Sequence, residues 1–345
     1  MAFARIGNKR VGDGYPCFIS FEPGATHQGL ESAKRLCRAA AEAGADAVKF
    51  QTVRASDIMS PHEDYQVEYQ TPNGKRSESV YEALQRRELT FDEWRNLKAY
   101  CDDLDILFIA SPSSKETVDW LTAMDVAAIK VSKSDINHRL MIDYIAQQGL
   151  PVILDGRERF EDVEEAARIC ERHGVKDIII MHCPSGYPAE HAGVHLSAIP
   201  HIRQIFNYPV GYADHSIGTA MNFAALGLGV DLIEKTITED RAMDAVEHYM
   251  SLPMSKLKEF VEQVRAVEAA FGNPRVIFSS RVKATHRRSI VTTRDVKEGE
   301  KIDLDALDFK RPGTKIPVDR YQEVIGRTAA QDIPAGTFLD FDDLA

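Results

Sequence analysis

Short apolar runs alternate with longer segments of helical periodicity over the first three-quarters of the chain. The runs cover residues 17–21, 46–50, 106–110, 127–131, 151–155, 177–181, 208–212 and 231–235. Amphipathic segments such as 30–44, 160–174 and 219–229 lie between them, and several end on glycine, as helices often do. Eight strand–helix repeats predict an α/β fold, the (β/α)8 barrel. The alternative is an open doubly wound sheet, but the turn GATHQG lacks the GxGxxG spacing that such a sheet usually carries.

The pattern changes after a last helical segment at residues 255–272. A small β-rich unit follows, in which DVKEGEKI and DIPAGTFL share one shape: an acidic residue, a turn and a short strand. We therefore predict a barrel domain over residues 1–275, a linker over 276–286 and a β-rich domain over 287–345.

Composition narrows the class of protein. A chain of 345 residues that is 44% hydrophobic and 28% charged is neither disordered nor fibrous. Its net charge of −11 argues against nucleic acid or an anionic membrane as a partner. The five cysteines are irregularly spaced without a CxxC pair, and no apolar stretch has membrane-span length. We therefore expect a cytoplasmic protein with reduced thiols.

Polar residues follow most of the predicted strands. Because the carboxyl ends of barrel strands meet at one mouth, we expect these side chains to converge there. Four of them are cations: Lys49, Lys130, Lys133 and Arg157. Such a cluster predicts an anionic ligand, a phosphate or a carboxylate, to which serine hydroxyls add donors.

Two alternatives to an anion site stay open at this point. In the first, Lys130 and Lys133 pair with the carboxylates of Asp135, Asp155 or Glu234 and bind nothing. In the second, cationic neighbours lower the pKa of Lys133, which then acts as a Schiff-base nucleophile.

Several motifs resemble the sialic acid synthase (N-acetylneuraminate synthase-like) family. They are, in order, FEPGATHQG, AGADAVKFQT, VYEALQRREL, HCPSGYP, GYADHS and IEKTIT, and the tail FKRPGTKIP resembles that family's antifreeze-like (SAF) domain. The resemblance implies a (β/α)8 enzyme that condenses phosphoenolpyruvate with an N-acylated mannosamine-type aldose. The products are a 2-keto-3-deoxy sugar acid and phosphate. It also implies a domain-swapped homodimer and a divalent metal, usually manganese, held by two histidines.

Site residues follow from the motif matches together with the cation cluster. We expect catalytic roles for Glu22, His215 and Lys133, with His215 as a hydrogen-bond donor or general acid. The resemblance also implies that an arginine of the SAF domain reaches the partner's site. The expected substrate contacts are Lys49, Gln51, Ser111, Lys130, Arg157, Ser185, Tyr187, Asp214, Glu247 and Arg311.

The chain departs from the family pattern at functional positions. Thr236 stands where the second metal histidine belongs, and Lys133 and Ala213 replace serines. A threonine hydroxyl is a poor transition-metal ligand, so only His215 is left and we predict no firm cofactor, at most weak manganese or magnesium. Three interpretations fit: condensation without a firmly held metal, a Schiff-base lyase or aldolase using Lys133 or Lys130, and a sugar-acid binder without turnover.

Overall fold

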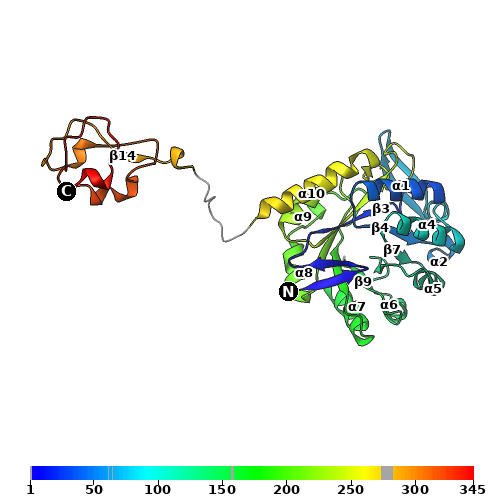
Figure 1. Cartoon of the computed structure of the whole chain (residues 1–345). Helices are drawn as coiled ribbons and strands as arrows, with labels where there is room; N and C mark the ends of the chain where they lie inside the picture. The colour runs from blue at the N-terminus through cyan, green and yellow to red at the C-terminus, as the bar shows by residue number, and fades with distance from the viewer. Residues whose placement is uncertain (1, 61, 64, 157–158, 273–282) are drawn as a thin grey trace. The chain divides into compact units, whose positions relative to one another are not determined.

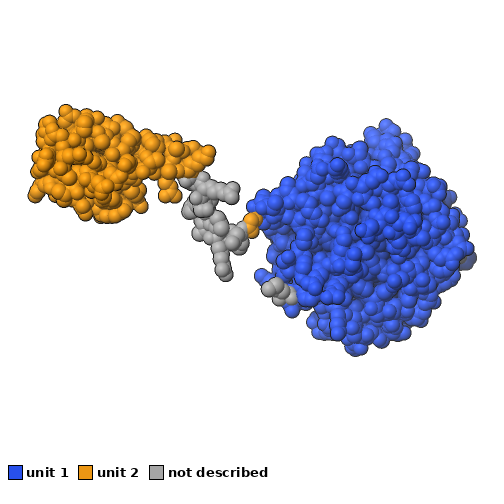
Figure 2. Space-filling model, viewed as in Figure 1, with its two compact units in different colours: residues 1–271 blue, residues 272–345 orange. Residues whose placement is uncertain are grey.

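The structure is a computed structural model that describes residues 2–60, 62–63, 65–156, 159–272 and 283–345 (Figure 1). The chain divides into two compact units, residues 1–271 and 272–345 (Figure 2). Each unit is considered by itself below. Arg157 and residues 276–282 of the predicted linker lie outside the described residues. The boundaries at 275 and 287 stay predictions.

Eight parallel strands form the centre of the first unit. They are β3 (Phe18–Glu22), β4 (Ala47–Thr52), β7 (Leu107–Pro112), β8 (Ala128–Val131), β9 (Val152–Gly156), β10 (Ile178–His182), β11 (Val210–Asp214) and β12 (Leu232–Thr238). Neighbours in the sheet follow chain order, and β12 pairs with both β11 and β3, which closes the barrel. The predicted (β/α)8 fold is confirmed, and each predicted run overlaps one strand.

Helices cover the outside of the barrel (Figure 1). They are α1 (Leu30–Glu42), α4 (Phe91–Asp103), α5 (Lys115–Ala123), α6 (Arg139–Ala146), α7 (Phe160–Arg172), α8 (Ala198–Phe206), α9 (Ala220–Gly227) and α10 (Leu257–Phe271). In α4, Trp94 is fully buried and packs edge-on against Phe50 and Phe108 of the sheet. Thr90 caps this helix through a reciprocal pair of bonds with Glu93. None of the helices that the structure describes is long and apolar enough to cross a membrane.

Two hairpins interrupt the regular alternation, and the sequence pattern does not predict them. The first is β1 (Phe3–Ile6) with β2 (Lys9–Gly12), whose apolar face packs against residues at the amino ends of the strands. It closes that end of the barrel. The second is β5 (Gln66–Thr71) with β6 (Gly74–Ser79), between α2 (Ala55–Ile58) and α3 (Val80–Gln85). A two-residue strand, β13 (Leu252–Pro253), extends the pairing beyond β12.

The barrel interior changes character along its axis. Apolar residues fill the amino-terminal half, where Met181 occupies so much space that a Cβ on Gly211 would lie 2.1 Å from its sulfur atom. Charged residues fill the carboxyl-terminal half, where Glu22, Lys130 and Glu234 are all buried. This polarity places the chemistry of the chain at the carboxyl ends of the strands.

The second unit is a small β-rich domain. Its two strands, β14 (Ser289–Thr292) and β15 (Leu307–Lys310), pair antiparallel. The similar motifs DVKEGEKI and DIPAGTFL lie side by side, because Val296 and Ile333 exchange backbone hydrogen bonds of 2.9 and 2.8 Å. Each motif also begins with an aspartate, and the side chain of each aspartate accepts a hydrogen bond from a backbone N–H of the other motif. The two motifs therefore resemble each other in sequence because they form two matching, hydrogen-bonded parts of one structure.

Candidate active site

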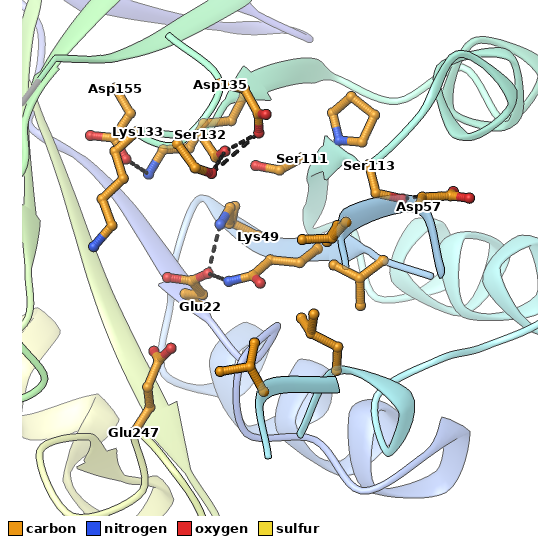
Figure 3. Close-up of a pocket in the computed structure, with 18 of the residues that line it drawn as sticks. Glu22, Lys49, Asp57, Ser111, Ser113, Ser132, Lys133, Asp135, Asp155 and Glu247 are labelled. Atoms are coloured by element: carbon orange, nitrogen blue, oxygen red, sulfur yellow. Dashed lines mark hydrogen bonds and ion pairs between the residues drawn. The ribbon is translucent and has the colours of Figure 1, made fainter. Parts of the chain in front are cut away.

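A cavity of about 590 Å³ opens at the carboxyl ends of the barrel strands (Figure 3). It brings together residues from β3, β4, β7, β8, β9 and β12 and from the loops after β4, β7, β8, β10, β11 and β12. The predicted site residues that line it are Glu22, Lys49, Gln51, Ser111, Lys130, Lys133, Tyr187, His215 and Glu247. The convergence predicted from the strand ends is thus observed for these residues.

Glu22, Lys49 and Gln51 form one hydrogen-bonded group (Figure 3). The Nζ of Lys49 and the Nε2 of Gln51 lie 2.6 and 2.8 Å from Oε1 of Glu22. Burial alone would raise the pKa of Glu22, but Lys49 and Lys130 outweigh it and lower this pKa to about 2. Glu22 is therefore a carboxylate at neutral pH, which suits it to stabilise positive charge.

Lys130 lies between two carboxylates. Its Nζ is 2.6 Å from Glu234 and 3.3 Å from Asp155. Burial opposes the charged form, but Asp155 and Glu234 raise the pKa of Lys130 well above its usual value. The pairing of this lysine with internal carboxylates, one of the alternatives above, is therefore observed. The ammonium nevertheless lines the cavity and stays protonated.

Lys133, Tyr187 and His215 form a second group. The ammonium of Lys133 contacts the Tyr187 hydroxyl and lies 4.1 Å from its ring centre, and the His215 ring lies 4.7 Å from the same ring. Burial and then Lys133 lower the pKa of His215 to about 4, so the imidazole is neutral at pH 7. Its Nδ1 is 3.4 Å from the carbonyl oxygen of Pro184, which can only accept. The same nitrogen lies 3.9 Å from the Cys183 thiol, and the expected role of His215 as a hydrogen-bond donor stays a prediction.

Glu247 projects into the cavity from the loop after β12 (Figure 3). Its backbone φ of +74° is in the left-handed region, which residues other than glycine adopt infrequently. Burial and then the negative charge of Glu22 raise the pKa of Glu247 to about 7. A carboxyl with this pKa exchanges its proton near neutral pH, as a general acid requires.

Arg87 is a buried cation that the sequence analysis missed. It is 7% exposed, its Nε donates to the Ala83 carbonyl, and its Nη1 has no hydrogen-bond partner among the described residues. Its charge lowers the pKa of Glu247. Spacing offers a partial signal, because Arg87 lies two residues beyond the end of α3 and four residues after Ala83, which that helix buries.

Two predicted residues of the first unit, Asp214 and Ser185, do not line the cavity. Asp214 is buried but held elsewhere, by Lys235 at 2.7 Å and the Ser216 amide at 2.9 Å. Ser185 is exposed at the surface, and Arg311 is an exposed residue of the second unit. Arg157 lies outside the described residues.

The side chains near His215 fit a firmly held divalent metal poorly. Within the described ranges, no three residues among His, Cys, Asp and Glu are grouped to ligate one. The oxygen of Glu22 nearest the lysines is already bonded to Lys49 and Gln51. The charge of Lys133 acts on His215 directly and repels a dication. Thr236, at the position expected for a second histidine, offers a buried hydroxyl without a partner in the described chain.

Residues 36–275 match the NeuB family, and residues 287–345 match the SAF domain. The chain belongs to the NeuB family. The resemblance to sialic acid synthases is thereby confirmed, together with the barrel and the SAF domain that follows it.

Two solved structures and one curated relative illustrate this NeuB membership. The chain is 31% identical to the N,N'-diacetyllegionaminic acid synthase of Legionella pneumophila, over 96% of each chain. The spore coat polysaccharide biosynthesis protein SpsE of Bacillus subtilis superposes with a TM-score of 0.68 and 31% identity, covering 100% of this chain and 99% of that one. The N-acetylneuraminic acid synthetase of Leptospira borgpetersenii gives a TM-score of 0.71 at 26% identity, covering 81% and 94%. This NeuB protein is an enzyme, a transferase that forms a carbon–carbon bond, and its relatives support a sugar-acid synthase activity in general.

Proposed function

We propose that this enzyme condenses phosphoenolpyruvate with an N-acylated amino aldose, without a firmly bound metal. The observation that carries the proposal is a group of hydrogen-bond donors on three adjacent strands. Lys49 on β4 and Lys130 on β8 flank β7, where the buried hydroxyl of Ser111 has no partner among the described residues. Two ammonium groups beside a free hydroxyl suit a phosphate or carboxylate of the substrate.

The reaction balances with one water molecule. C3 of phosphoenolpyruvate forms a bond to the aldehyde carbon, and the aldehyde oxygen gains a proton. Water supplies the oxygen at C2, phosphate leaves, and a 2-keto-3-deoxy acid results. We assign phosphate and carboxylate binding to Lys49, Lys130 and Ser111.

The remaining cavity residues take complementary roles in this proposal. Glu22, ionised in its group with Lys49, stabilises the positive charge that develops at C2. Lys133 polarises the aldehyde, which replaces the charge that a metal supplies in relatives with two histidines. Glu247, with a pKa of about 7, donates the proton to the aldehyde oxygen.

The ion pairs of Lys130 favour condensation over Schiff-base chemistry through that residue. A Schiff base requires a neutral amine, whereas Asp155 and Glu234 raise the pKa of Lys130 well above its usual value, against the effect of burial. Lys133 is the other lysine to test, because it lines the cavity beside Tyr187.

The experiment incubates the full chain with phosphoenolpyruvate and N-acetylmannosamine in EDTA and measures phosphate release and the mass of the product. We expect turnover, and a loss of phosphoenolpyruvate affinity in Lys49→Met of about 1.5–3 kcal/mol by calorimetry. Lys256→Met, an exposed lysine at the start of the α10 region, is the matched control. Borohydride trapping of a pyruvate adduct would instead support a lyase, and phosphoenolpyruvate that fails to bind would contradict the proposal.

The proposal includes the predicted pairing of two chains, in which Arg311 of one chain serves the site of the other. The cytoplasmic location and the absence of nucleic acid and membrane partners stay predictions.

A further inference from the structure

One wall of the cavity is apolar and belongs to a single stretch of chain. Residues of the segment after β4, which includes α2 and α3, supply it: Val53, Ile58, Met59, Val80 and Leu84. We call these five residues the apolar wall. Three of them, Val53, Met59 and Leu84, are buried in a small core of their own with Ala55. The wall is therefore built on a packed cluster.

Charge is distributed unevenly around the cavity. Among the described lining residues, Lys49, Lys130 and Lys133 come from β4, β8 and the loop after β8, whereas residues 53–84 supply no cation. Asp57 is the charged residue of that stretch that lines the cavity. Its carboxylate accepts hydrogen bonds from Arg54 at 2.9 Å and from Ser113 at 3.2 Å. Figure 3 shows Asp57 and Ser113 on the side of the cavity away from Lys133 and Asp155.

We infer that the apolar wall binds the end of the acceptor sugar remote from its aldehyde, and selects a methyl-bearing, uncharged end over a terminal phosphate. The inference rests on the proposed function, which places phosphoenolpyruvate at the lysines and the aldehyde beside it. A methyl group gains by leaving water for the wall. A phosphate loses its hydration there, next to the Asp57 carboxylate, and finds no cation on the wall to compensate.

Three acceptors that differ only at C6 test the selectivity: N-acetylmannosamine, its 6-deoxy analogue and its 6-phosphate. Phosphate release from phosphoenolpyruvate is followed for each. We expect kcat/KM for the 6-deoxy sugar to exceed that for the 6-phosphate by at least about tenfold, the discrimination typical of one methyl-sized group in a fitted pocket. Equal or better use of the 6-phosphate overturns the inference.

A matched pair of variants locates the selectivity on the wall. Ile58 and Ile205 are both 48% exposed, but Ile58 belongs to the wall and Ile205 lies on the outer helix α8. We expect Ile58→Arg to raise kcat/KM for the 6-phosphate and lower it for the 6-deoxy sugar, each by about tenfold. Ile205→Arg leaves both values unchanged. If the two variants behave alike, the wall does not select the acceptor.

The outcomes separate this inference from the proposed function. Condensation with the wrong order of acceptors contradicts the selectivity and leaves the condensing reaction standing. Phosphoenolpyruvate that neither binds in a calorimetric titration nor reacts with any of the three acceptors contradicts both.

Discussion

Lys130 on β8 places its ammonium nitrogen 2.6 Å from a carboxylate oxygen of Glu234 on β12. Three strands separate β8 from β12 in either direction around the barrel, so this ion pair crosses the interior. Both side chains are at most 5% exposed. Carboxylates of the protein itself thereby hold a buried cation inside the barrel, at the end where the cavity opens.

The first prediction concerns the stability of this pair. Glu234→Gln leaves Lys130 with only the longer contact to Asp155, and we expect a loss of roughly 3 kcal/mol in the free energy of unfolding. The double variant Lys130→Met/Glu234→Leu removes this pair but leaves the buried Asp155 carboxylate without its cation, so we expect it to recover only part of that loss. Urea unfolding of the single and double variants measures both. A double variant less stable than Glu234→Gln would show that the charges contribute net stability.

The second prediction is a pH profile set by Glu247. Burial and Glu22 raise its pKa to about 7, so the acid form that donates a proton is lost as the pH rises through 7. We expect the rate to fall above pH 7 in the native enzyme, and Glu247→Gln to lose about a hundredfold in rate together with this limb.

The same carboxyl affects stability with a definite sign. Its folded pKa lies above its usual value of 4.5, so the folded state is favoured below that value and loses this contribution as the pH rises through 7. Glu247→Gln should therefore gain stability relative to the native chain at pH 8 compared with pH 4. Glu259→Gln on the exposed face of α10 is the control. In the rate measurements, if the fall in rate above pH 7 persists in Glu247→Gln, the general acid is another residue.

The third prediction assigns Arg87 a positioning role. Its charge lowers the pKa of Glu247, so Arg87→Met should move the falling limb of the pH profile to higher pH. The side chain makes no ion pair in the described structure, and its one bond, to the Ala83 carbonyl, is worth about 1 kcal/mol. The unfolding midpoint should therefore change little. Arg95→Met, an exposed arginine on α4, should leave the limb where it is. A limb that does not move would reduce Arg87 to a structural residue.

The fourth prediction concerns the metal. His215 is neutral at pH 7 but has Thr236 where a second imidazole is expected, so we expect activity that survives EDTA. Thr236→His supplies the missing ligand, and we expect manganese affinity to rise by at least about tenfold in a calorimetric titration. Thr238→His, two residues along the same strand, is the control. Purified native protein that carries stoichiometric manganese would contradict this prediction.

The fifth prediction concerns the second unit. If Arg311 serves the site of a partner chain, Arg311→Ala should lose about a hundredfold in rate with an unchanged unfolding midpoint. Arg320→Ala, another exposed arginine of the same unit, should keep its activity. Light scattering gives the number of chains in the active species. An active monomer would exclude the exchange of SAF domains.

Local pattern was sufficient for the barrel and for most of the site. Each strand was visible as an apolar run, and the residues just beyond several runs, Glu22, Gln51 and Ser111 among them, line the cavity because parallel strands share one end. Period-two alternation also predicts that Thr236 and Lys235 point to opposite sides of β12. The structure agrees, with Lys235 paired to Asp214 while Glu234 faces the cavity.

The sequence by itself therefore determined the fold, the family and which side of each strand carries chemistry. The tertiary structure determined which side chains contact one another. Lys130 finds Glu234 across 104 residues of chain, Arg87 lies buried near Glu247 instead of in solvent, and the apolar wall gathers from both sides of a hairpin. Periodicity specifies a direction for a side chain, whereas pairing and pKa depend on distances that exist only once the barrel has closed.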